Sequence, residues 1–189
     1  MDDEKILVVI PYRKGEIEQA TKAADIHKSR AGMPVQVYLM EDEYKEGWVA
    51  MQNWAARNLN YDYLIYSCDD YFPGINYVKI AYDTLQKTGK GLCVFNDGKW
   101  YGHIATAGLI SRKLIEKLPY DMGLFSDDYK QNYGDTELTD VTIHLKEIVY
   151  NPDAVLMEID YEKESKPHLN MKDKLTYRNK KVEWVKHFD

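Results

Sequence analysis

Residues 62–74 restrict the fold most, because an apolar strand pattern there runs directly into two adjacent carboxylates and a turn. The apolar run at 64–66 is typical of a buried, parallel strand, and the Pro-Gly pair at 73–74 ends it. Asp69 and Asp70 would then lie at the carboxyl end of the strand, where open α/β sheets bind ligands. Adjacent carboxylates repel each other unless a cation lies between them, and hard oxygen ligands favour Mg²⁺ or Mn²⁺. The stretch predicts a metal-phosphate site, and a solvated turn with a helix cap stays open as the alternative.

The remaining sequence alternates between strand and helix patterns, which predicts a single α/β domain. Strand patterns cover residues 6–10, 35–40, 90–95, 101–109 and 154–159; helix patterns cover residues 16–30, 48–59, 77–85 and 111–118, and resume at 134. The tripeptide Asn96-Asp97-Gly98 predicts a hairpin between two of the strands. Residues 123–133 show little periodicity and are expected to form a loop.

Composition places the chain among ordinary globular proteins. Its 189 residues are 44% hydrophobic, and no apolar run approaches the roughly 18 residues that a membrane-spanning helix needs. The acidic start at residues 1–5 is unlike a secretory signal, so we expect a cytoplasmic location. Cys68 and Cys93 lack the spacing of a zinc site or a disulfide framework, and both are expected to be reduced.

The formal net charge of -6 argues against a broad basic surface for nucleic acid or anionic membrane. Positive charge gathers near the end of the chain, at Lys172, Lys174, Arg178, Lys180, Lys181 and Lys186. Two interpretations remain open for this cluster: the solvated face of an amphipathic helix, or a phosphate-binding surface.

Single residues next to the predicted strands are further candidates. No G-x-G-x-x-G and no P-loop motif is present, yet Arg13 or Lys14 in the basic turn after the first strand could meet a phosphate. Asp42 follows the second strand, where a carboxylate commonly contacts a ribose, although an exposed acidic loop explains it equally well. Asp135 lies in the first turn of a helix, whose dipole favours an ionised carboxylate ready to accept a proton. A helix cap is the alternative for Asp135, and a surface histidine is the alternative for His168.

In order and spacing, motifs across residues 6–159 resemble the nucleotide-sugar-dependent glycosyltransferases of the GT-A fold, especially family 2. The family's first strand is matched by residues 8–13, which read Val-Val-Ile-Pro-Tyr-Arg. The family motif A-R-N-x-G is resembled by residues 51–55, and the segment that ends in D-x-D is resembled by residues 61–70. The later motif [GE]-D-x-[DE]-L is matched by residues 134–138. The resemblance implies a three-layer α/β/α sandwich with a mostly parallel central sheet over residues 1–160. Residues 161–189 would form a basic tail or helix packed on it.

The resemblance also implies roles for individual residues. Pro11 and Arg13 would border the nucleotide, Asp42 would hold its base or ribose with Glu41 as a rival, and Asn53 and Asp69 would contact the donor. Asp70 would bind the metal, and His168 would be a further metal ligand by its order along the chain. Asp135 would be the catalytic base. Cys68 stands where the family has the first aspartate of D-x-D, which departs from the pattern.

The implied activity is transfer of a sugar from a nucleotide-diphosphate sugar, with a UDP-sugar as the first candidate, to an acceptor hydroxyl. It would depend on Mn²⁺ or Mg²⁺ and invert the anomeric centre. The acceptor would be a glycan, a small molecule or, with less support from the acidic net charge, modified DNA. A nucleotidyltransferase and a non-catalytic nucleotide-sugar-binding module are the two rival hypotheses, and Cys68 favours the second.

Overall fold

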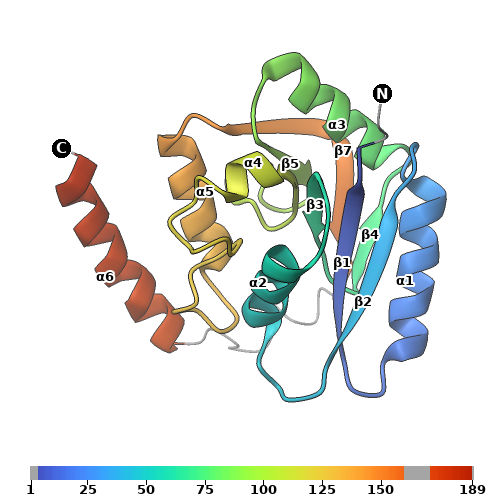
Figure 1. The fold of residues 1–189 in the computed structure, drawn as a ribbon, viewed down its shortest axis with the longest axis horizontal. Helices are drawn as coiled ribbons and strands as arrows, with labels where there is room; N and C mark the ends of the chain where they lie inside the picture. Colours follow the sequence, from blue (N-terminus) through green and yellow to red (C-terminus); the bar gives the residue numbers. More distant parts are fainter. Residues whose placement is uncertain (1–3, 160–170, 189) are drawn as a thin grey trace.

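The apolar run that begins at Ile6 forms strand β1 (Ile6–Arg13), which has a parallel neighbour on each side. Figure 1 shows this computed structural model, which describes residues 4–159 and 171–188. Besides β1, the described residues form α1 (Ile17–Arg30), β2 (Gln36–Asp42), α2 (Trp48–Asn58), β3 (Tyr63–Tyr66), β4 (Tyr71–Pro73), α3 (Tyr77–Thr88), β5 (Leu92–Asn96), β6 (Gly108–Ser111), α4 (Arg112–Ile115), α5 (Gly134–His144), β7 (Ile148–Glu158) and α6 (Met171–Phe188). The alternation of strands and helices confirms the predicted α/β class.

One seven-stranded sheet runs through the domain in the order β2-β1-β3-β6-β5-β7-β4. The pairs β1–β2, β1–β3 and β5–β7 are parallel, whereas β3–β6, β5–β6 and β4–β7 are antiparallel. The expectation of a mostly parallel sheet was therefore wrong, and the sheet is mixed. The reason is that β6 and β4 run against all their neighbours, while β1, β2, β3, β5 and β7 point the same way.

Helices cover both faces of the sheet, which explains why β1 is apolar without alternation. Leu7 and Val9 pack with residues of α2, α4 and α5, whereas Val8 and Ile10 pack with residues of α1 and α3. In Figure 1 the sheet is seen nearly edge-on, with α1 on one side of β1 and β2 and with α2 and α5 on the other.

Several local predictions need correction. The Asn-Asp-Gly tripeptide does not form a tight hairpin; β5 and β6 do pair antiparallel, but residues 97–107 connect them. This happens because Asp97 accepts the N–H groups of Lys99 and Trp100 and the hydroxyl of Thr106, which holds a longer loop. Strand β4 forms where a turn was expected, β6 begins at Gly108 rather than at 101, and β7 begins at Ile148, earlier than the predicted 154.

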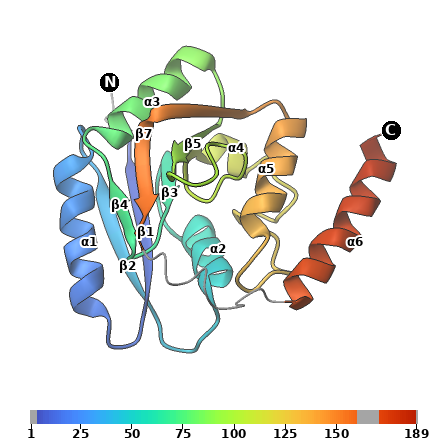
Figure 2. The same cartoon turned by 180° about the vertical axis from the view of Figure 1, so that it is seen from behind.

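Helix α6 lies at the margin of the molecule beside α5 (Figures 1 and 2). The Tyr177 hydroxyl donates to Asp140 of α5 at 2.7 Å, and the Lys181 ammonium group lies 3.3 Å from the same carboxylate. No helix in the described part of the chain is both long and apolar enough to span a membrane. Within that part both cysteines are free, and burial raises the pKa of Cys93 to about 12.

Candidate functional site

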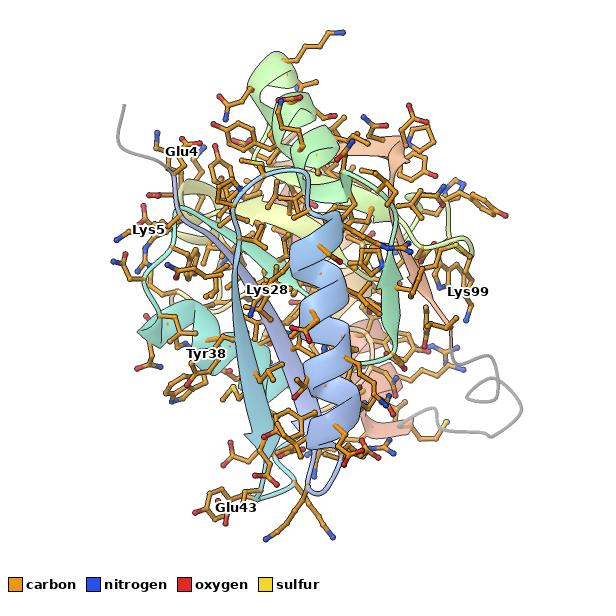
Figure 3. The ribbon with its side chains drawn as sticks, turned by 90° about the vertical axis from the view of Figure 1, so that its right-hand side faces the viewer. Glu4, Lys5, Lys28, Tyr38, Glu43 and Lys99 are labelled. Carbon is orange, nitrogen blue, oxygen red and sulfur yellow. The ribbon has the colours of Figure 1, made fainter. Side chains whose placement is uncertain are left out.

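Polar side chains collect where the parallel strands end. Because β1, β2 and β3 are parallel, their carboxyl ends meet at one edge, which brings Arg13, Asp42 and the loop after Tyr66 together. Figure 3 shows this polarity: Glu4 and Lys5, before β1, lie at one end of the sheet, and Glu43, directly after β2, lies at the opposite end.

A pocket of about 390 Å³ opens at this edge, and five of the predicted site residues line it: Pro11, Arg13, Asp42, Asp69 and Asp70. Cys68 also lines the pocket, so the residue that replaces the first aspartate of D-x-D faces the same space. The structure thus brings together residues that are far apart in the sequence and belong to three strands or the loops that follow them.

Asp42 rather than Glu41 faces the pocket. Neighbouring side chains of a strand point in opposite directions, and on β2 Glu41 is exposed on the other side. The two carboxylate oxygens of Asp42 accept the N–H groups of Glu46 and Gly47 at 2.8 and 3.2 Å. Each oxygen retains acceptor capacity, so the side chain both holds the turn after β2 and can still bind a ligand.

Buried polar groups hold Ser67, which lies at the start of the loop that carries Asp69 and Asp70. The Ser67 carbonyl accepts the indole N–H of Trp48 at 3.1 Å and the amide of Gln52 at 3.0 Å. The Ser67 hydroxyl lies 3.4 Å from Nε2 of His27, whose Nδ1 lies 2.6 Å from the Tyr77 hydroxyl. Burial lowers the pKa of His27 to about 4. The contacts of His27 with Ser67 and Tyr77 join residues far apart in the sequence, so only the tertiary fold shows that His27 supports this loop.

Asp135 is not among the residues that line the pocket. Burial raises the pKa of Tyr71, which follows Asp70 in the sequence, well above its usual range, and the charges of Asp70 and Asp135 act in the same direction. Asp135 Oδ1 accepts the N–H of Thr136 at 2.7 Å. Burial also raises the pKa of Asp135 itself, against the expectation that the helix dipole would leave it unraised. Partial burial of the carboxylate outweighs the dipole and the Thr136 hydrogen bonds.

Asn53 is not among the residues that line the pocket, and its expected contact with the donor stays a prediction. Its Nδ2 donates to the Phe125 carbonyl at 2.9 Å and to Asp127 at 2.7 Å, and its Oδ1 accepts the N–H groups of Leu124 and Phe125 at 2.9 and 2.8 Å. These four bonds use its full hydrogen-bonding capacity. Asn53 therefore holds the loop before α5, a role that its match to A-R-N-x-G did not reveal.

Asp127 and Asp128, in the loop before α5, both form ion pairs. Arg57 binds Asp127 at 2.6 Å, and Lys180 of α6 lies 2.5 Å from Asp128. Both ion pairs hold the pKa of their carboxyl below its usual range through the hydrogen bond from the cationic partner. Asp127 and Asp128 are consequently poorer proton acceptors than Asp135.

Few side chains that could bind a metal lie together in the described part of the chain. Across residues 4–159 and 171–188 no three His, Cys, Asp or Glu side chains are grouped so that they could hold a metal ion. The predicted ligand His168 lies outside the described residues. Mg²⁺ is nevertheless usually bound by one or two carboxylates together with substrate phosphates, and Asp69 and Asp70 in the pocket fit that pattern.

Comparison with protein-family models finds no matching family, and comparison with curated proteins finds no similar sequence. Solved structures share the fold. The mannosyltransferase PcManGT from Pyrobaculum calidifontis, solved with GDP-Man and Mn²⁺, has a TM-score of 0.61 and 15% identity over 82% of this chain and 56% of its own. S. aureus TarS 1–349 in complex with UDP has a TM-score of 0.56 and 12% identity over 81% of this chain and 60% of its own.

At these identities the similarity shows a shared fold, which confirms the glycosyltransferase resemblance at the level of architecture. The chain spans 56% of the length of the mannosyltransferase and 36% of the length of the longer TarS structure.

Proposed function

We propose that this chain is a nucleotide-sugar-dependent glycosyltransferase. The observation that carries the proposal is the convergence of Pro11, Arg13, Asp42, Asp69 and Asp70 on one pocket at the carboxyl edge of the sheet. Structures of the same fold that hold GDP-Man with Mn²⁺, or UDP, support a nucleotide-sugar donor in that pocket.

Asp70 is the proposed protein ligand of a divalent cation, Mn²⁺ or Mg²⁺, with Asp69 beside it. When bound, this cation would neutralise charge on the diphosphate leaving group. Arg13 adds a guanidinium group at the same pocket and can donate two parallel hydrogen bonds to a phosphate. His168 is kept as a proposed additional ligand on the strength of the resemblance alone.

Asp42 is proposed to hold the ribose or the base of the donor. Its carboxylate is fixed by the turn after β2 and keeps an acceptor site on each oxygen. A UDP-sugar is our first candidate donor, and a GDP-sugar is the second because the mannosyltransferase of this fold was solved with GDP-Man.

Asp135 is the proposed general base of a single displacement that inverts the anomeric centre. Its oxygen would take the proton of an acceptor hydroxyl while that hydroxyl oxygen bonds to the anomeric carbon and the bond from this carbon to the diphosphate oxygen breaks. A raised pKa suits this duty, because a base works best when its pKa approaches the working pH. A glycan or small-molecule acceptor agrees better with the net charge of -6 than DNA does.

The test is a turnover assay with UDP-, GDP- and dTDP-sugars in the presence of Mn²⁺. Slow release of the nucleoside diphosphate by the wild-type chain, at least about 100-fold reduced in Asp135→Asn, is the expected result. Release of pyrophosphate from a nucleoside triphosphate and sugar phosphate would instead identify a nucleotidyltransferase. Saturable nucleotide-sugar binding without any release would identify a non-catalytic binding module.

A further inference from the structure

A buried carboxylate of α6 holds the loop that precedes α5. Asp173, in the first turn of α6, is only 1% exposed. It accepts three successive backbone N–H groups, from Lys130 at 3.3 Å and from Gln131 and Asn132 at 3.0 Å each. Successive N–H groups of this kind form a concave anion-binding site, and hydrogen bonds to a charged acceptor are stronger than neutral ones.

The same loop forms a wall of the candidate donor pocket. Gln131 lines the pocket together with Gly47, which lies in the turn after β2. The loop approaches Gly47 so closely that a Cβ atom there would come within 2.7 Å of the Lys130 carbonyl oxygen. Gly47 also has a φ of 96°, which side chains rarely tolerate. The position of this loop therefore sets where Gln131 stands in the pocket wall, next to the turn that contains Gly47.

A second contact from α6 holds the other end of the loop. The Lys180 ammonium group lies 2.5 Å from Asp128 and 5.4 Å from the centre of the Tyr129 ring. On α6, Lys180 and Lys181 are thus paired with Asp128 of the loop and Asp140 of α5. Part of the basic cluster seen in the sequence serves contacts within the chain.

We propose that Asp173 is a positioning residue of the donor pocket and that α6 is an integral part of that site. This inference rests on the proposed function for the identity of the ligand, but the anchoring of the loop can be measured without it. Asp173 does not touch the pocket itself; it acts through the backbone of Gln131.

The test compares Asp173→Asn with Asp140→Asn as a matched control. Both variants neutralise a carboxylate that joins α6 to the rest of the chain, but only the first removes the charge that accepts the loop N–H groups and replaces one of its oxygens by an NH₂ group. Two quantities are measured at a temperature where every variant is fully folded: amide hydrogen exchange at residues 130–132, and the Kd of UDP and of GDP with Mn²⁺ by calorimetry.

In Asp173→Asn we expect exchange at residues 130–132 to become about tenfold faster and the nucleotide Kd to rise about tenfold. Asp140→Asn should leave both within about twofold, because it loosens α6 only against α5. Equal effects in the two variants, or none in Asp173→Asn, would overturn the inference.

If Asp173→Asn does not fold, Lys180→Gln replaces it and should change both quantities in the same direction, by a smaller factor. Unchanged exchange and Kd in that variant would likewise overturn the inference. If the wild-type chain binds neither nucleotide, the proposed function fails, and the exchange measurement still decides whether Asp173 anchors the loop.

Discussion

Acidification is expected to destabilise the protein through His27, which is fully buried between α1 and the sheet. Its ring nitrogens face the hydroxyls of Tyr77 and Ser67 rather than a carboxylate, so no anion compensates a positive charge there. Burial accordingly lowers the pKa of His27 from 6.5 to about 4. The neutral ring belongs to the folded state, and the unfolded chain takes up a proton first as the pH falls.

The size of the effect follows from the difference between the two pKa values. With about 1.36 kcal/mol for each unit, the shift from 6.5 to about 4 corresponds to about 3 kcal/mol of unfolding free energy. Because the folded pKa lies below the unfolded one, this contribution is complete above about pH 6.5 and is lost progressively as the pH falls to about 4.

Urea denaturation of the wild type, His27→Gln and the control His103→Gln, at pH values from 7 down to 4, measures this contribution. His27→Gln should be less stable than the wild type at pH 7, and the gap should narrow by about 3 kcal/mol on acidification because only the wild type has this histidine to protonate. His103 is exposed, so His103→Gln should follow the wild type at every pH. Parallel curves for the wild type and His27→Gln would refute the reasoning.

Three further outcomes are expected. The kcat/KM of the wild type should rise with pH, and the rise should lie above pH 3.8, because Asp135 must be deprotonated to act and burial raises its pKa. A kcat/KM that does not change between pH 4 and 7 would contradict this. The Asn53→Ala variant should have an unfolding free energy about 2–4 kcal/mol lower than the wild type, measured by urea denaturation, because the Leu124 and Phe125 N–H groups lose their acceptor. An unchanged urea midpoint would contradict this. Cys68→Ser should keep measurable sugar transfer, and a covalent sugar adduct on Cys68 detected by mass spectrometry would show a different mechanism.

Local patterns were sufficient to predict the strands that build the pocket. The apolar run of β1 and the run before Asp69 and Asp70 each mark a strand buried on both faces, and their carboxyl ends meet because the strands are parallel. The position of Asp42 at the same edge of the sheet could be predicted for the same reason, since Asp42 ends β2, which pairs with β1 on the other side.

Features that depend on distant contacts were not predictable. The direction of β6 is set by its pairing with both β3 and β5, and no local pattern encodes that pairing. The motif around Asn53 says nothing of the loop 71 to 74 residues further along that its side chain binds. The raised pKa of Asp135 comes from burial by the folded chain, whereas the sequence reveals only its place in the first turn of a helix.

Calorimetric titration of UDP and GDP into the wild type and Asp70→Asn, with and without Mn²⁺, tests the central claim most directly. The control is Asp83→Asn, which removes an exposed carboxylate that pairs with Lys79 on α3. We predict that the wild type and the control bind at least one of the two nucleotides more tightly with Mn²⁺, and that Asp70→Asn loses most of this gain. Binding of neither nucleotide by the wild type, or an unchanged Mn²⁺ effect in Asp70→Asn, would contradict the assignment of this pocket as a metal-assisted nucleotide-sugar site.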